Sequence, residues 1–396
     1  MANPFKYGKV VSGEDFADRT METKQLVEDL RSGQNILLYS PRRYGKTSLI
    51  IRALDILRSQ GVIIAYIDLF RCVTLSDLAD KIVQEVVVQS QGKIDKIAEF
   101  FKDQISGVRP EFRLNSDGSI AVTLKKEIES MGPELILSKV LDVPEKVAEN
   151  RQKRVVVAFD EFQEITSLNE GKNYSIEKAM RSSFQVQKDV TFLFAGSKQH
   201  MLAEMFGKEK RPFYKFAKAF PIGKIPLEEF VEFILTKFKD TTIDVSKETV
   251  DKMLFFTQGH PYITQQLCHE VWNIANDHKK VEQTDVEKAI KVILTQHGDY
   301  FGKIWDSLKS NQKKLMVAIA QEGTVKNIYS VSFIEKYNLL SASHVKRSLN
   351  QLESEALLER SDEGYYIEDV FLREWVRTTA CACGPTPLCV ENKPRI

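Results

Sequence analysis

The sequence predicts an α/β fold in which a parallel sheet covered by helices is followed by an all-helical region and a winged helix. Three observations lead to this prediction. Short apolar runs alternate with helical patterns in the first half of the chain, which is typical of a parallel sheet with helices on both faces. After about residue 226 only helical patterns continue. Near residue 310 a pattern of three helices and two short strands begins, as in winged helix-turn-helix domains.

Five apolar runs are candidates for the parallel strands, since none of them has a polar face. They are Asn35–Tyr39, Val62–Asp68, Val155–Phe159, Thr191–Ala195 and Phe220–Ile225. A helical pattern from about Lys46 to Arg58 follows the first run. A charge-rich stretch of about residues 90–154 separates the second run from the third, and we interpret it as an insertion. Its turn-rich segment Glu111–Val122 is a hairpin candidate.

The second half of the chain is predicted to hold helices and one short hairpin. The first helices are predicted at Leu227–Lys239, Lys247–Phe256, Tyr262–Asn276 and Thr284–Thr295. The winged helix is predicted from helices at Asn311–Gln321, Ser330–Tyr337 and Ser343–Glu355, with strands at Leu357–Arg360 and Tyr365–Glu368. We therefore expect a core at 1–225, a helical lid at 226–305, a winged helix at 306–377 and a disordered tail at 378–396.

Composition excludes several classes of protein. The chain has 396 residues, 43% of them hydrophobic and 28% charged, which is ordinary for a globular protein. Lys+Arg 56 against Asp+Glu 55 gives a net charge of +1, so bulk charge predicts neither nucleic-acid nor membrane binding. No apolar run is long enough for a membrane helix or a signal peptide. The isolated Cys72 and Cys268 favour a reducing compartment, and we expect a cytoplasmic protein.

The strongest motif is the segment Ser40–Thr47, with the sequence Ser-Pro-Arg-Arg-Tyr-Gly-Lys-Thr, between the first strand and its helix. Backbone N–H groups in such a loop, together with a helix N-terminus, bind polyphosphate. Lys46 would place its ammonium between the β- and γ-phosphates, and the Thr47 hydroxyl would ligate Mg²⁺. Gly45 lets the phosphate approach the backbone. Ser40 stands where this motif usually begins with glycine.

A second motif follows the Val155–Phe159 strand, where Asp160 and Glu161 form a carboxylate pair. In a phosphate-loop sheet, an acidic residue at the end of a neighbouring strand holds Mg²⁺ and its waters, and we assign Asp160 to the metal. A second carboxylate can orient and deprotonate the attacking water, and we assign Glu161 as this base. Alone, an Asp-Glu pair is more often a solvated turn. Together with Lys46 and Thr47, it predicts ATP binding and hydrolysis.

Other polar residues are candidates for supporting roles. Ser197 follows the fourth strand and would read the γ-phosphate and position the water, although capping of the next helix is an equal alternative. Lys198 is a weaker candidate for the same role. We interpret His260 as a structural loop histidine rather than as a base. The sequence does not choose among four candidate arginines for charge stabilisation, which are Arg42, Arg43, Arg181 and Arg211.

These motifs resemble those of the prokaryotic, archaeal-type ATPases of the STAND/AAA+ class, and they are distantly similar to the Orc1/Cdc6-type ATPases. The resemblance extends to about Arg377 and rests on Phe16–Arg19 with Glu22 and Leu26, Pro41–Leu49, Phe159–Gln163, Ala195–Ser197 and Gln258–Tyr262. It implies an AAA+-like P-loop NTPase with Walker A and Walker B motifs. It also implies ATP and Mg²⁺ as ligands, with a nucleotide site made by Phe16, Arg19, Pro41, Arg42, Arg43, Tyr44, Gly45, Lys46, Thr47, Ser48 and Pro261.

The resulting hypothesis is an ATPase that acts as a nucleotide-driven switch coupled to the winged helix. A low-turnover, ATP-bound scaffold or DNA-binding regulator is the alternative. The helix Ser343–Glu355 presents polar and basic residues outward, a mix suited to a DNA groove, whereas acidic residues at Asp362-Glu363 would repel phosphate. Double-stranded DNA and a protein therefore both stay open as partners. The sequence does not decide the oligomeric state.

Overall fold

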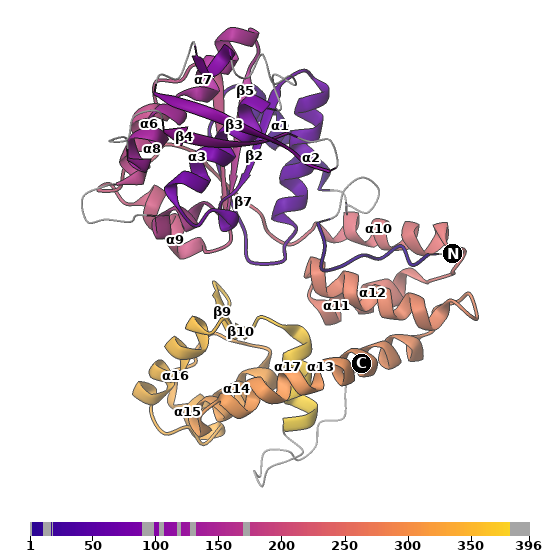
Figure 1. Ribbon diagram of the computed structural model, residues 1–396. Helices are drawn as coiled ribbons and strands as arrows, with labels where there is room; N and C mark the ends of the chain where they lie inside the picture. The colour runs from indigo at the N-terminus through magenta and orange to yellow at the C-terminus, as the bar shows by residue number, and fades with distance from the viewer. Residues whose placement is uncertain are drawn as a thin grey trace. The chain divides into compact units, whose positions relative to one another are not determined.

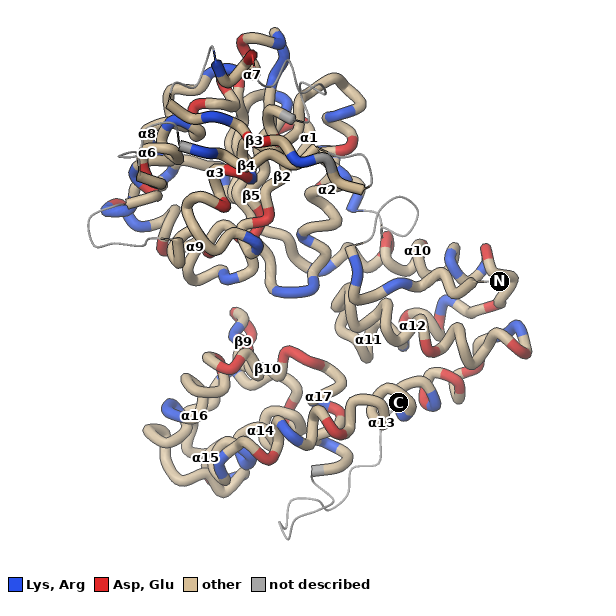
Figure 2. The backbone as a smooth tube through the Cα atoms, in the orientation of Figure 1, with Lys and Arg blue, Asp and Glu red and all other residues tan. Residues whose placement is uncertain are grey.

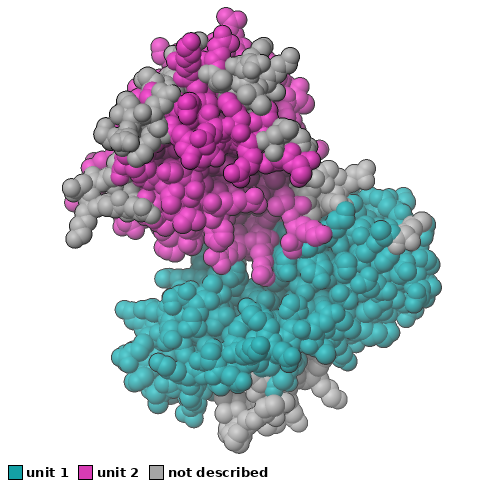
Figure 3. Space-filling model, in the orientation of Figure 1, with its two compact units in different colours: residues 1–7, 227–396 teal, residues 8–226 magenta. Residues whose placement is uncertain are grey.

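The computed structural model describes residues 2–10, 17, 19–88, 99–102, 107–116, 120–126, 132–168 and 175–380. The chain divides into two compact units, which Figure 3 shows in different colours. We call Gly8–Pro226 the core unit, and Leu227–Ile396 with Met1–Tyr7 the helical unit. Of the tail expected at 378–396, residues 378–380 belong to the helical segment Val376–Ala380, and the rest lies outside the described residues. In the described part of the chain, no helix has the length and apolar character needed to cross a bilayer.

The core unit is built on the parallel sheet that the sequence predicts (Figure 1). Its five strands are all parallel and follow the order β2-β5-β6-β1-β7. Their bounds are β1 Ile36–Tyr39, β2 Ile63–Asp68, β5 Val155–Asp160, β6 Val190–Gly196 and β7 Lys218–Pro221. Four strands lie within two residues of their predicted bounds. The edge strand β7 begins and ends earlier than predicted, and Ile222 adds only one further backbone hydrogen bond, to Tyr39 O.

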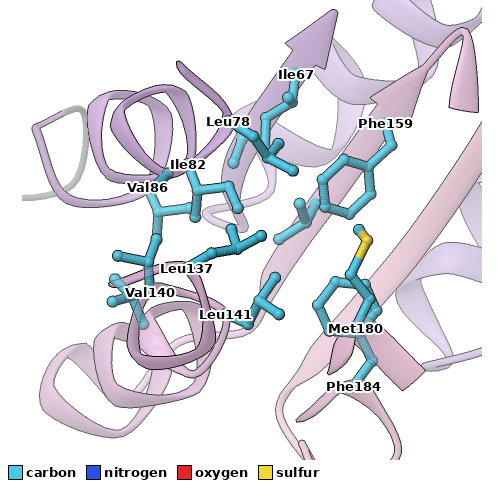
Figure 4. Packing of buried hydrophobic residues seen from close by; sticks show 14 of the residues in the cluster. Ile67, Leu78, Ile82, Val86, Leu137, Val140, Leu141, Phe159, Met180 and Phe184 are labelled. Carbon is cyan, nitrogen blue, oxygen red and sulfur yellow. The ribbon is translucent and has the colours of Figure 1, made fainter. Parts of the chain in front are cut away.

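Helices cover both faces of the sheet because successive strand residues point to opposite sides. On one face, Val156 and Ala158 pack against helices α1 and α2. On the other face, Val155, Val157 and Phe159 pack against the remaining helices (Figure 4). The helix bounds are α1 Thr20–Arg31, α2 Lys46–Ser59, α3 Leu75–Val83, α6 Pro133–Val140, α7 Val143–Arg151, α8 Ile176–Phe184 and α9 Gln199–Gly207. The carboxyl ends of the strands are thus held by a dry core on both sides.

The predicted insertion contains the expected hairpin. Strands β3 (Val108–Leu114) and β4 (Ile120–Lys126) pair in an antiparallel two-stranded sheet. The hairpin packs on α3 and the turn after it, where Gln84 donates to Ile120 O at 2.8 Å and accepts from Val122 N at 2.9 Å. Asp80 of α3 accepts from Leu124 N at 2.8 Å. Side chains from α3 and the turn after it therefore satisfy the backbone groups on one edge of the hairpin, an edge that would otherwise be open to pairing.

The helical unit begins with four helices, as predicted. They are α10 Leu227–Asp240, α11 Lys247–Thr257, α12 Pro261–Ala275 and α13 Gln283–Ser307. The prediction that the fourth helix ends at Thr295 is wrong, because α13 continues for twelve more residues. Gly298 and Gly302 each disfavour a helix by about 1 kcal/mol. Burial of Phe301, whose ring lies 6.2 Å from that of Trp375, offsets this loss.

The winged helix has the predicted three helices and hairpin, together with two elements that the sequence did not predict. The predicted elements are α14 Ser310–Glu322, α15 Val331–Lys336, α16 Ala342–Ser354, β9 Leu358–Ser361 and β10 Gly364–Ile367. The additional elements are β8 (Thr324–Val325), which pairs with β10, and α17 (Val370–Trp375). Gly364 is required where β8 approaches, since a Cβ there would lie 2.3 Å from Val325 O. Asp369 begins α17 by accepting from two backbone N–H groups.

Candidate active site

The loop between β1 and α2 has the backbone geometry of an anion-binding site. Gly45 is the N-cap of α2 and has φ 82°, a left-handed conformation that glycine adopts without steric cost. Arg43 also has a positive φ, of 65°, which is uncommon for a residue with a Cβ. The N-terminus of α2, which carries the positive end of the helix dipole, follows directly. Ser40 is buried at the start of the loop, where its hydroxyl donates to Pro41 O at 3.0 Å.

Lys46 and the carboxylate pair after β5 meet, although 114 positions separate Lys46 from Asp160. Lys46 Nζ donates to Asp160 Oδ1 and lies 3.1 Å from Glu161 Oε1. Thr47 Oγ1 donates to Asp160 Oδ2 at 2.9 Å. Lys46 and Asp160 are only 6% and 3% exposed, so both charges are held away from water and depend on each other.

Tyr66, in β2, is a member of this cluster that sequence reasoning missed. Its hydroxyl donates to Asp160 Oδ2 at 2.8 Å. Burial alone would raise the pKa of Asp160, but the Lys46 ammonium and the hydrogen bonds from Lys46, Tyr66 and Thr47 hold it below its usual value. Burial and the nearby charge of Asp160 raise the pKa of Tyr66. Asp160 is therefore ionised, and Tyr66 is a neutral hydroxyl donor.

Glu161 follows β5 in a left-handed conformation, with φ 52°. Its Oε2 accepts from Gln163 Nε2 at 2.6 Å, from Ser197 Oγ at 3.0 Å and from Ser197 N at 3.3 Å. Burial would raise the pKa of Glu161, but Lys46 and the Gln163 hydrogen bond lower it overall. Glu161 is therefore ionised and can accept a proton. The Ser197 hydroxyl bonds Glu161, and α9 begins after Lys198 without a side-chain cap in the described structure.

Comparison of the sequence with known protein families identifies the family of the chain. Residues 16–267 match the family described as an ATPase domain predominantly from Archaea. The chain belongs to this archaeal-type ATPase family. Residues 299–378 match a second family, described as a probable winged helix domain. No sequence among the curated proteins matches the chain. The family resemblance inferred from the motifs is thus confirmed, and the protein is an ATP-binding ATPase.

Solved structures of other proteins have the same fold as this archaeal-type ATPase. A Walker-type ATPase of Pyrococcus abyssi is 17% identical, with 94% of this chain and 99% of that chain covered and a TM-score of 0.64. The ORC2 protein of Aeropyrum pernix, in ADPNP-ADP complexes, is 13% identical, with 95% of both chains covered and a TM-score of 0.56. At these identities the likeness confirms the fold, namely a P-loop NTPase core with a C-terminal winged helix.

The remaining sequence-predicted residues of the ATPase differ in their surroundings. Arg19 is 1% exposed and donates to Tyr44 O at 3.0 Å and to Gly223 O at 2.7 Å, so that it contacts the backbone of the phosphate loop. Phe16 lies outside the described residues. Pro261 is the first residue of α12, and His260 is the N-cap of that helix. Within the loop, Tyr44 and Ser48 are buried, Pro41 and Gly45 are half-buried, and Arg42 and Arg43 are exposed.

The other candidate cations of the ATPase already have partners within the core unit. Arg181 lies 4.2 Å from the centre of the Phe216 ring and donates to Gln185 at 2.8 Å. Arg211 pairs with Glu177 at 2.6 Å. Lys198 pairs with Glu164, likewise in the core unit, at 2.8 Å. Among the residues that the structure describes, Lys46 contacts the carboxylate pair, and Arg42 and Arg43 are exposed on the loop itself.

The donor set suits a magnesium ion. Asp160 provides a carboxylate and Thr47 a hydroxyl, and their oxygens lie 2.9 Å apart. Both are hard oxygen ligands of the kind that Mg²⁺ prefers, and Mg²⁺ sites commonly use only one or two protein ligands together with substrate phosphates. These two residues therefore fit the metal that phosphate-loop chemistry requires.

Proposed function

We propose that the protein is a Mg²⁺-dependent ATPase in which nucleotide binding and hydrolysis switch the conformation of the chain and thereby control its winged helix. The observation that carries this proposal is the convergence of Lys46, Thr47, Asp160, Glu161 and Ser197 at one end of the parallel sheet. The proposal keeps a core at 1–225, of which Met1–Tyr7 belong to the helical unit, a lid at 226–305 that includes Pro261, and a winged helix at 306–377. Phe16, Arg19 and Pro41–Ser48 are the proposed nucleotide-binding residues of the core.

The geometry supports a direct attack of water on ATP. The loop N–H groups and Lys46 would bind the phosphates, and Glu161 would take the proton of the attacking water. As the water oxygen bonds to the γ-phosphorus, the bond from this phosphorus to the β–γ bridging oxygen breaks, and ADP and phosphate leave. Ser197 would orient the water beside Glu161. When bound, Mg²⁺ would neutralise phosphate charge, and Asp160 and Thr47 would hold it.

Glu161→Gln tests this assignment. The variant keeps the size and the hydrogen-bonding capacity of the side chain but removes the base. We expect steady-state phosphate release to fall by about 10²- to 10⁴-fold while ATP affinity is retained. Glu28→Gln, at an exposed position on α1, is the control and should leave the rate unchanged. Replacing Mg²⁺ by EDTA should abolish turnover of the wild type. Equal, near-zero rates for wild type and Glu161→Gln would instead favour the low-turnover scaffold.

The partner of the winged helix remains a choice between double-stranded DNA and a protein. Exposed residues of α16, among them Lys346 and Arg347, would support phosphate contacts, whereas the exposed Asp362 and Glu363 beyond β9 would oppose them (Figure 2). Electrophoretic mobility shifts with and without ATP, at moderate salt, separate the two. A shift that is lost in Lys346→Ala with Arg347→Ala would support DNA. No shift for any duplex at micromolar protein would leave the protein partner.

A further inference from the structure

Gln163 lies in the short 3-10 segment Phe162–Leu168, directly after the carboxylate pair, and is 2% exposed. We infer that Gln163 is a positioning residue, which fixes Oε2 of Glu161 so that Oε1 is the atom that receives the proton. This inference rests on the proposed function, since it refines how Glu161 acts as a base. Neither the sequence motifs nor the family match assigns a role to this side chain.

The first support is that the two carboxylate oxygens of Glu161 have different partners. Oε2 accepts three hydrogen bonds, of which the one from Gln163 is the shortest at 2.6 Å. Oε1 instead lies 3.1 Å from Lys46 Nζ, the group that would bind the phosphates. A carboxylate with one oxygen anchored from two directions has a fixed plane, and its second oxygen is held on the side of Lys46.

The second support comes from the space around the amide. Gly196, the last residue of β6, has no Cβ, and a Cβ built there would lie 2.1 Å from Gln163 Oε1 and 2.9 Å from Leu202 Cδ1. The φ of Gly196 lies outside the left-handed region, so its backbone does not require glycine. The glycine is instead needed because the amide of Gln163 occupies that space.

The third support is the incomplete bonding of the amide itself. Among the described residues, Gln163 Oε1 accepts no hydrogen bond although it is buried. Burying an amide oxygen without a partner is unfavourable, and an apolar side chain of similar size would avoid this loss. The benefit of Gln163 must therefore come from its Nε2 donor, which bonds Glu161 and only weakly reaches Glu164, at 3.4 Å.

Two independent variants test the inference in the full chain. Gln163→Leu removes the donor at similar volume, and Gly196→Ala displaces the amide without changing it. Each should lower kcat for phosphate release by about 10- to 100-fold, because the base is no longer held in place. The KM for ATP and the equilibrium affinity for ATP should stay within about twofold of wild type. Matched controls are Ser167→Ala in the same 3-10 segment, and Gly207→Ala, which has open space for a Cβ; both should leave kcat unchanged.

A double-mutant cycle shows whether Gly196 acts through the amide. In a Gln163→Ala background there is no amide to displace, so adding Gly196→Ala should change kcat by less than about twofold. An undiminished effect in that background would overturn the link between the two residues. Wild-type kcat in Gln163→Leu would overturn the inference, as would a fall in kcat matched by a loss of ATP affinity. A rise in kcat would also overturn it, since the donors would then hold Glu161 away from the water.

The outcome for Glu161→Gln separates this inference from the proposed function. If Glu161→Gln loses turnover and Gln163→Leu does not, only the role of Gln163 is wrong. If Glu161→Gln hydrolyses ATP at the wild-type rate, or if the wild type has no turnover, the proposed function fails and the inference fails with it.

Discussion

Two Asp-Glu pairs lie at strand ends in this chain, Asp160-Glu161 at the end of β5 and Asp362-Glu363 after β9, and their surroundings are opposite. Asp160 is 3% exposed and contacts Lys46. Asp362 and Glu363 are both exposed at the tip of the wing, and neither carboxylate has an ion pair within the described ranges. The backbone N–H of Glu363 donates a hydrogen bond to Ser361 Oγ at 3.2 Å.

The comparison shows that the chemistry of an Asp-Glu pair is set by its neighbours and not by the two residues alone. Burying a carboxylate such as that of Asp160 next to the half-buried Glu161 is strongly unfavourable unless cations and donors compensate. For the first pair, compensation comes from the loop and start of α2, from β2, from the 3-10 segment after β5, and from the residue after β6. The second pair is solvated and needs none, so it can serve simply as a turn.

The largest effect is expected when Lys46, the cation that compensates the Asp160-Glu161 pair, is removed. In Lys46→Ala, both carboxylates of the first pair lose their compensating charge, and the phosphates lose a ligand. We expect ATP binding to become undetectable by calorimetry and the free energy of unfolding to fall by about 3–5 kcal/mol. Lys198→Ala is the matched control, because Lys198 pairs with Glu164 at a more exposed position and should contribute about 1 kcal/mol or less. Full ATP affinity in Lys46→Ala would contradict the proposed site.

A smaller effect is expected when the tyrosine donor is removed. Tyr66→Phe deletes the hydrogen bond to Asp160, which should lower the free energy of unfolding by about 1.5–3 kcal/mol. It should also raise the Mg²⁺ concentration needed for half-maximal phosphate release, since Asp160 loses a group that orients it. Tyr39→Phe is the control, because the Tyr39 hydroxyl has no hydrogen-bond partner in the described structure. Urea unfolding and a Mg²⁺ titration measure both effects, and identical values for the two variants would refute the role of Tyr66.

The smallest effect is expected at the wing. Neutralising the second pair by Asp362→Asn with Glu363→Gln should change the free energy of unfolding by less than about 0.5 kcal/mol. The rate of phosphate release should also stay the same. Thermal unfolding and the phosphate assay test this expectation. A loss of stability comparable to that of Tyr66→Phe would mean that the wing pair is not the simple solvated turn that its exposure indicates.

The Ser40–Thr47 loop and the Asp160-Glu161 pair could be predicted from the sequence because local patterns define both. Each lies at the carboxyl end of a buried strand, and parallel strands bring such positions to the same sheet edge. Tyr66 could not be predicted in this way, because its contact depends on β2 pairing next to β5. The sequence motif included Gln163, but its bond to Glu161 depends on the turn after β5 and on the space left by Gly196.

The elements that sequence reasoning missed share a dependence on tertiary contacts. The extension of α13 past Thr295 and the short helix α17 stabilise each other, as shown by the contact between Phe301 and Trp375. Neither segment has enough local signal to be recognised alone, although Asp369 before Val370 is a helix N-cap signal that could have indicated α17. The two-residue strand β8 exists only through its pairing with β10.

The buried guanidinium of Arg19 joins two distant stretches of backbone by donating to Tyr44 O and to Gly223 O. Such a bridge acts as a rigid tether, because a peptide carbonyl that moved would leave a charged donor unsatisfied in a dry environment. Gly223 lies just before Pro226, where the core unit ends. The peptide that leads out of the core unit is therefore held to the phosphate loop by a side-chain contact that is separate from the pairing of β1 with β7.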